Sequence, residues 1–196
     1  MPPPPSSPEG TTHLPEYTSR WSSRFILAAI VQGAIITGLT LFFVGAQVII
    51  SGINIIQFPS LSFEGPAKWF FLGYIFYPIL VVAIAVTAVF YNHLEVNMNR
   101  RISGIRSVLA WIHLFGMNVG GAATTITMIF AGLAGTRIID IILSGASAQA
   151  MENLQPNLTI MEQFVSPIAA LAGYLSVGVL SGGLAFVTSY YKKHSS

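Results

Sequence analysis

The chain has 196 residues, of which 53% are hydrophobic and only 8% charged, with a net charge of +2 and no cysteine. Soluble domains usually carry about a quarter charged residues, so this composition excludes a soluble globular protein and predicts an integral membrane protein. The small net charge gives no reason to expect nucleic-acid binding, and the lack of cysteine excludes disulfides, thiolate metal sites and cysteine nucleophiles.

The two ends of the chain differ in composition from its middle. Residues 1–22 are rich in Pro, Ser and Thr and contain no early apolar segment, which predicts a flexible tail rather than a signal peptide. Residues 192–196 form a short basic tail. The residues between them, 23–191, are expected to form one membrane domain.

Four apolar runs follow the N-terminal tail. They cover residues 25–50, 69–91, 107–135 and 164–191. Each run exceeds the roughly 20 residues that a helix needs to cross the hydrocarbon core. Lipid offers no hydrogen-bond partners to the backbone, so each run is expected to be helical. The predicted fold class is therefore an all-α integral membrane protein, a bundle of four transmembrane helices.

The basic residues predict the orientation of the bundle, because Lys and Arg concentrate on the cytoplasmic side of a membrane. Four spans place both termini on one side. That side would hold Arg20, Arg24, Arg100, Arg101, Arg106, Lys192 and Lys193, whereas the other side would hold Lys68 and Arg137. The expected protein is thus a multi-pass protein of the plasma membrane with both termini in the cytoplasm.

The two outer loops carry further patterns. Residues 52–63 could lie flat on the membrane, and residues 146–156 are typical of a short helix that ends at Pro156. Residues 157–159, "NLT", form a glycosylation sequon on the predicted outer side.

Two prolines interrupt the apolar runs. Pro78 removes a backbone donor within the second span and frees the carbonyl of Tyr74, which predicts a kink. The kink could mark a site or could serve packing. Pro167 is expected in the first turn of the fourth span, where proline costs little.

The third span contains many small and polar residues. Residues 113–135 have no charged side chain but include one Asn, three Thr and five Gly. Small residues let membrane helices approach closely, and amide and hydroxyl groups can then bond across the contact. The predicted helix-packing residues are Gly116, Asn118, Gly120, Ala123, Thr124 and Thr127 in the third span, and Gly178 and Gly182 in the fourth. The alternative is a substrate path lined by Asn118 and the threonines.

Two histidines are the candidates for binding a cofactor. His113 lies well within the third span, and His93 lies at the inner end of the second span. A bis-histidine haem needs both imidazoles at one depth, whereas these positions differ in depth by roughly 10 Å at 1.5 Å per residue. We therefore expect no bound cofactor or metal in this chain. No spacing typical of a catalytic site, a phosphate-binding loop or a charged transport path is visible in the sequence.

Residues 102–140, "ISGIRSVLAWIHLFGMNVGGAATTITMIFAGLAGTRIID", resemble the penultimate helix of haem-copper oxidase subunit I, and the B-type branch best. The segment "AGLAGTRI" keeps part of that family's motif at the end of this helix. Two features depart from the family. The stretch "KWFFLGYIF" lacks the family's haem-ligating His-x-His pair, and Arg137 follows Thr136 where the family has Pro and an Arg pair. The resemblance thus implies a haem-free relative of the C-terminal four helices.

These features predict a non-catalytic accessory subunit of a membrane enzyme complex, in contact with lipid and with other membrane subunits. The resemblance favours a respiratory haem-copper terminal oxidase as the host complex. One alternative is an accessory subunit of a copper membrane monooxygenase of the ammonia or methane type. A second is a small b-haem electron-transfer subunit that uses His93 and His113, and a third is a channel or transporter for a small solute.

Overall fold

The computed structural model describes residues 19–49, 65–144 and 158–191. Within these ranges four helices are long and apolar enough to cross a membrane, as predicted. They indicate a multi-pass membrane protein. The expected interfacial loop 52–63, the short helix 146–156, the sequon asparagine and the C-terminal tail 192–196 lie outside the described residues.

Each of the four expected spans is a helix. The helices are α1 (Arg20–Ile49), α3 (Ala67–Asn92), α4 (Ile105–Phe115), α5 (Ala122–Gly135), α6 (Ile138–Ser144) and α8 (Leu158–Tyr190). Two π-helical turns, η1 (His93–Asn97) and η2 (Gly116–Gly121), extend α3 and join α4 to α5. The third span is therefore one continuous helix, α4–η2–α5, with a widened turn at its centre. The short α6 was not expected from the sequence.

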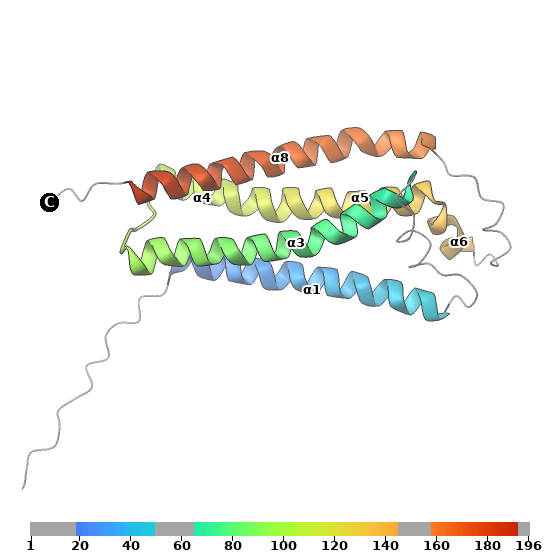
Figure 1. Ribbon diagram of the computed structural model, residues 1–196, viewed down its shortest axis with the longest axis horizontal. Helices are drawn as coiled ribbons and strands as arrows, with labels where there is room; N and C mark the ends of the chain where they lie inside the picture. Colours follow the sequence, from blue (N-terminus) through green and yellow to red (C-terminus); the bar gives the residue numbers. More distant parts are fainter. Residues whose placement is uncertain (1–18, 50–64, 145–157, 192–196) are drawn as a thin grey trace, which may run out of the picture.

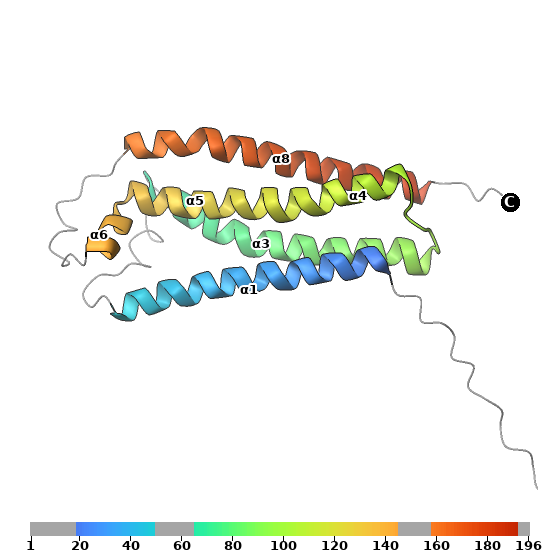
Figure 2. The same cartoon turned by 180° about the vertical axis from the view of Figure 1, so that it is seen from behind.

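The spanning helices lie side by side along one long axis (Figures 1 and 2). α3 packs against α1 and α5, and α8 packs against α4, η2 and α5. The third span is therefore central: 56% of its most apolar window is buried, compared with 11% for α1. The helices at the two outer positions, α1 and α8, present most of their surface to the surroundings.

α1 begins inside the segment that the sequence assigned to the flexible tail. Arg20 is already helical, and the Ser19 and Trp21 side chains are buried. Glu95 of η1 stabilises this start, because its carboxylate accepts hydrogen bonds from the Ser19 hydroxyl at 2.5 Å and the Trp21 backbone N–H at 3.1 Å. The predicted tail boundary at residue 22 is therefore wrong for residues 19–22, whose order depends on a partner far along the chain.

The prolines occupy different settings from each other. α8 starts at Leu158 rather than near residue 164, so Pro167 lies inside the helix and not in its first turn. Pro78 lies inside α3 as predicted, and its side chain is exposed. Figure 1 shows α3 bending along its length, with its N-terminal part turning toward α5. The loss of the backbone donor at Pro78 gives a physical reason for such a bend.

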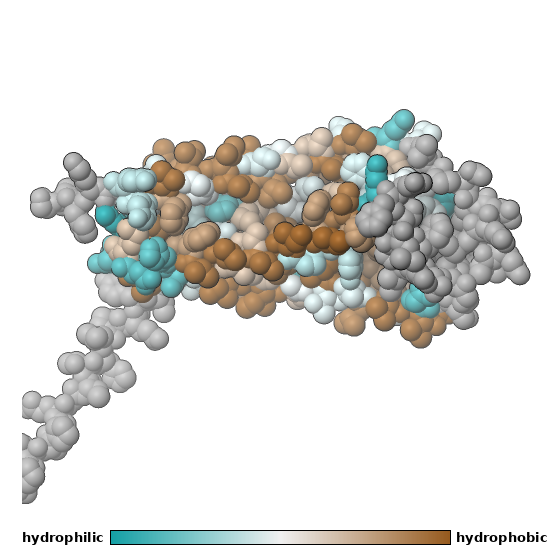
Figure 3. Space-filling view, in the orientation of Figure 1, coloured by the Kyte–Doolittle hydropathy of each residue, from teal (hydrophilic) through white to brown (hydrophobic). Residues whose placement is uncertain are grey.

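Apolar side chains form both the interior and most of the lateral surface. The largest core cluster surrounds Trp21, Phe25, Tyr77, Ile84 and Leu94, where α1, α3, η1 and the third span meet. Large apolar side chains such as Leu27, Val82 and Leu180 are more than half exposed. Figure 3 shows brown, apolar side chains over much of this lateral surface, with hydrophilic side chains gathered at the left-hand end. A soluble protein rarely has such a surface, and lipid or protein can cover it.

Candidate functional site

The centre of the third span touches α8 through backbone atoms. A Cβ on Gly178 would lie 2.6 Å from the Cα of Gly116, and a Cβ on Gly116 would overlap Gly178 in turn. A Cβ on Gly120 would lie 2.8 Å from the backbone nitrogen of Leu175. The structure thus brings three of the predicted packing glycines into one helix–helix contact within the chain.

A second close contact lies on the α3 side of the same span. A Cβ on Gly132 of α5 would lie 2.6 Å from the Phe70 Cβ, and a Cβ on Gly73 of α3 would lie 2.6 Å from the Thr125 carbonyl oxygen. Gly73 and Gly132 were not among the predicted packing residues, because they lie outside the stripe of small residues that contains Gly116 and Gly120. The third span is in fact buried on two sides, and the spacing of Gly121, Gly132 and Gly135 could have indicated the second side.

The threonines do not bond across the contact, which corrects the sequence-based expectation. The Thr124 hydroxyl donates to the Gly120 carbonyl oxygen at 2.6 Å, and the Thr125 hydroxyl donates to the Gly121 carbonyl oxygen at 3.0 Å. Both partners lie one turn back in the same helix, a common arrangement for threonine in helices. Thr124 is buried, whereas Ala123 and Thr127 are half-buried.

Asn118 does bond across helices, but its partner lies on α1. The Gln32 side-chain amide donates to the Asn118 carbonyl oxygen at 3.2 Å and to its side-chain oxygen at 3.3 Å. The Tyr77 hydroxyl donates to the Gln32 Oε1 at 2.6 Å, and the Asn118 Nδ2 donates to the Leu114 carbonyl oxygen at 2.8 Å. Three helices are thereby joined by one polar network inside the apolar layer.

The π-helical turn η2 contains Asn118 as well as Gly116 and Gly120. A π-helical turn holds an extra residue, and such turns occur often at functional sites. Here the turn directs the Asn118 amide toward Gln32 of α1, while Gly116 and Gly120 contact α8. Gln32 was not predicted, although an amide inside an apolar run is a usable signal because lipid cannot satisfy its hydrogen bonds.

His113 is buried inside the bundle. Its Nδ1 is 3.3 Å from the Tyr91 hydroxyl, and its ring centroid is 5.2 Å from that of Phe25. A Cβ on Gly182 would overlap three atoms of the imidazole. The predicted packing residue Gly182 thus makes room for His113. The structure brings this glycine and the histidine considered as a cofactor ligand into one contact.

His93 points away from this cluster. Its side chain is exposed, and its Nδ1 lies 3.1 Å from the Asn97 amide on the same turn. The side chains of residues two apart on a helix point about 200° from each other. Because Tyr91 faces His113, the His93 side chain points away from His113. The two imidazoles therefore do not share a site within this chain. A haem held by both would not fit the described residues.

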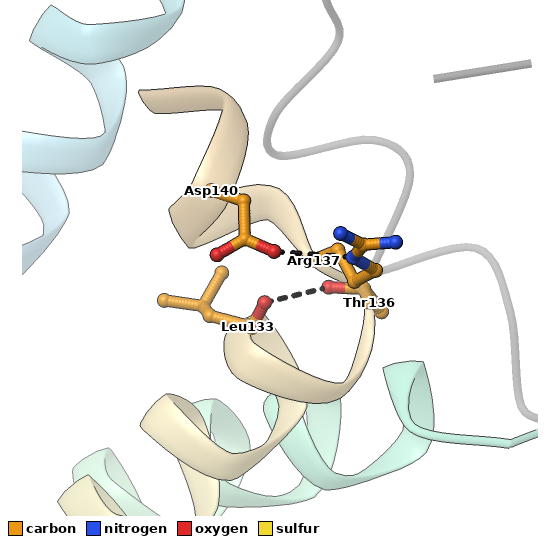
Figure 4. A network of polar contacts seen from close by, with 4 residues as sticks. All are labelled: Leu133, Thr136, Arg137 and Asp140. Atoms are coloured by element: carbon orange, nitrogen blue, oxygen red, sulfur yellow. Dashed lines mark hydrogen bonds and ion pairs between the residues drawn. The ribbon is translucent and has the colours of Figure 1, made fainter. Parts of the chain in front are cut away.

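Arg137, which the resemblance places near the end of the third span, pairs with a neighbour. Its Nε lies 3.1 Å from an Asp140 carboxylate oxygen, while the Thr136 hydroxyl donates to the Leu133 carbonyl oxygen at 3.1 Å (Figure 4). Arg137 adopts a left-handed backbone with φ +60°, which joins α5 to α6. This residue thus serves the local turn from one helix to the next.

The described residues contain no group of three or more His, Asp or Glu side chains that could hold a metal ion. A scan against protein-family models, a search of curated proteins and a search of solved structures each found no match. The arguments about function therefore depend on the sequence and on the contacts described above.

Proposed function

We propose that this protein is a non-catalytic accessory subunit of a multi-subunit membrane enzyme complex. The observation that carries the proposal is the setting of His113, which among the described residues is the one histidine buried in a span. Its ring fits against Gly182 and its Nδ1 pairs with Tyr91, so the side chain serves helix packing. Asn118 and Gln32 likewise form a hydrogen bond with each other rather than lining an open path. This pairing disfavours the alternative of a channel or transporter.

The proposed role is to help fold, assemble or border a catalytic subunit. Gly38 and Gly45 on α1, and Gly173 and Gly183 on α8, face open space: apart from their own helix backbone, no described atom lies within 4 Å of a Cβ placed there. Such open small positions allow close approach by the helices of another subunit. The favoured host is a respiratory haem-copper terminal oxidase, because residues 102–140 resemble a helix of its subunit I.

The topology within this proposal follows from charge. Arg20 and Arg24 start α1, Arg100 and Arg101 follow η1, and Arg106 starts α4, all at one end of the bundle. The positive-inside rule assigns that end to the cytoplasm and both termini with it. The plasma membrane is the proposed location.

Purification of the native complex through a tag on this chain tests the proposal. Mass spectrometry of the co-purifying subunits is expected to find a haem-copper catalytic subunit in constant ratio to the chain. Subunits of a copper monooxygenase in its place would support the alternative host. A chain that purifies alone with a stoichiometric Soret band, lost in His113→Ala, would instead support the b-haem carrier and contradict the accessory role.

A further inference from the structure

Basic side chains concentrate at the end of the bundle where α1 begins and α3 ends. Arg20 and Arg24 lie one turn apart on α1, and Arg106 lies in the first turn of α4. Figure 3 shows hydrophilic side chains gathered at this end, next to the apolar lateral surface. The boundary between these regions is where a phospholipid headgroup meets the hydrocarbon layer.

Arg24 is held in a fixed position at this boundary. Its guanidinium carbon lies 4.6 Å from the ring centroid of Trp21 and 4.6 Å from that of Trp111. The two indole rings are 5.4 Å apart in an edge-to-face arrangement, and Trp21 is 3% exposed because it packs into the core beside Tyr91. The cation therefore rests between side chains of two helices, one of which is anchored in the core.

This arrangement leaves the hydrogen-bonding edge of Arg24 available. A guanidinium over an aromatic ring is attracted by the charge distribution of the ring, and this attraction does not use up its N–H donors, which stay available for an anion. Arg24 is exposed and has no carboxylate partner among the described residues. Glu95, the carboxylate that the described residues place at this end, already accepts hydrogen bonds from Ser19 and Trp21 at the start of α1.

The surroundings of Arg24 indicate an amphipathic ligand. Trp and Tyr side chains concentrate at the level of the headgroups, which places the guanidinium at the depth of the phosphates. Leu27 lies one turn further into the membrane on the same face of α1 and is 63% exposed, and Phe115 lies one turn deeper than Trp111, stacks on its ring and is 51% exposed. A ligand that binds here meets a cation first and apolar side chains next.

We propose that Arg24, held over the indole rings of Trp21 and Trp111, binds the phosphate of an anionic phospholipid whose acyl chain runs along Leu27 and Phe115. Arginine matches phosphate with two parallel N–H donors, and stacking limits the side-chain freedom lost on binding. Arg20 and Arg106 add positive charge that favours an anionic over a zwitterionic headgroup. This proposal does not depend on the identity of the host complex.

The test uses the full-length protein in nanodiscs that contain phosphatidylcholine alone or mixed with phosphatidylglycerol. Native mass spectrometry measures how many phosphatidylglycerol molecules the released protein retains, and tryptophan emission reports the stack. Arg24→Gln is expected to weaken retention about fivefold, the effect of one cation near an anionic surface. Arg20→Gln removes the same charge outside the stack and is expected to have a smaller effect.

Two more variants separate the site from general charge attraction. Arg24→Lys keeps the charge but loses the two-donor geometry, so weaker retention than wild type is expected. Trp111→Phe shrinks the stack at a partly exposed position and is also expected to weaken retention. Thermal unfolding checks that each variant folds. Equal retention by Arg24→Gln and Arg20→Gln, with both folded, would overturn the proposal.

A further arm distinguishes a lipid from free phosphate. Glycerol phosphate added to the protein in neutral detergent is expected to leave the tryptophan emission unchanged and to displace no phosphatidylglycerol. If this soluble headgroup displaces the lipid at concentrations similar to those of the lipid itself, the acyl chain contributes nothing. The assignment to a phospholipid would then be wrong.

Discussion

Gly116 of η2 and Gly178 of α8 touch through their backbones, so that neither residue has room for a Cβ atom. Membrane helices gain little from the hydrophobic effect when they associate, and close packing therefore supplies much of the attraction. The two glycines bring a long stretch of each helix into contact. This relationship makes the α4–η2–α5 helix the centre of the bundle and leads to the first two predictions.

Gly178→Ala is expected to destabilise the purified protein by about 1–3 kcal/mol, because the new methyl group meets backbone that cannot rotate away. Gly173→Ala, on the same helix but facing open space, is the matched control and should change stability by less than about 0.5 kcal/mol. Thermal unfolding in detergent measures both. Similar melting temperatures for the two variants would contradict the close contact.

Gly120→Leu is expected to insert into the membrane normally but to pack and assemble poorly. Leucine suits lipid better than glycine, yet its side chain would collide with the backbone of Leu175. Val108→Leu, at an exposed position near the start of α4, is the control. A native gel of the complex compares them. If both variants assemble like wild type, the face that contains Gly120 does not need close packing.

Gln32→Leu is expected to weaken the packing of α1 on the bundle by about 0.6–2 kcal/mol of free energy. The reason is that Tyr77 and Asn118 lose their shared hydrogen-bond partner in a layer without water. Thr37→Val is the control, since that hydroxyl bonds only to its own helix. A Gly33→Cys and Val81→Cys pair reports the α1–α3 contact through its cross-linking yield. Lower yield with Gln32→Leu, and wild-type yield with Thr37→Val, is the expected pattern.

Gly182→Ala and His113→Ala are expected to show strong coupling. The alanine at position 182 collides with the imidazole, so it should destabilise the wild-type protein but cost much less when His113 is already alanine. Unfolding of both single variants and the double variant gives the coupling energy. Additive effects would show that the ring and the glycine do not touch. The absorbance spectrum of the same samples is expected to lack a Soret band.

A cysteine at position 153 is expected to react with an impermeant reagent added outside the cell, whereas a cysteine at position 195 is not. The prediction rests on the excess of arginine at the end of the bundle that holds Arg24 and Arg106. The native chain has no cysteine, so each variant carries a single reactive thiol. Labelling in the opposite pattern would reverse the proposed topology.

The sequence by itself determined the class of structure and the number of spans. Long apolar runs without charge can only be helices in lipid, because each backbone group must find its partner within the segment. The same reasoning found Gly116, Gly120, Gly178 and Gly182 as small residues suited to close contact. These features depend on composition and spacing along one helix, which the sequence records directly.

The tertiary structure alone decided which helices those residues meet. Gly116 and Gly120 face α8, Asn118 faces Gln32 on α1, and Gly182 makes room for His113. The start of α1 depends on Glu95, which lies more than seventy residues away along the chain. Such pairings depend on the rotation of each helix about its axis and on the widened turn at η2. Hydropathy predicts neither the rotation nor the turn, because lipid and neighbouring helices are equally apolar.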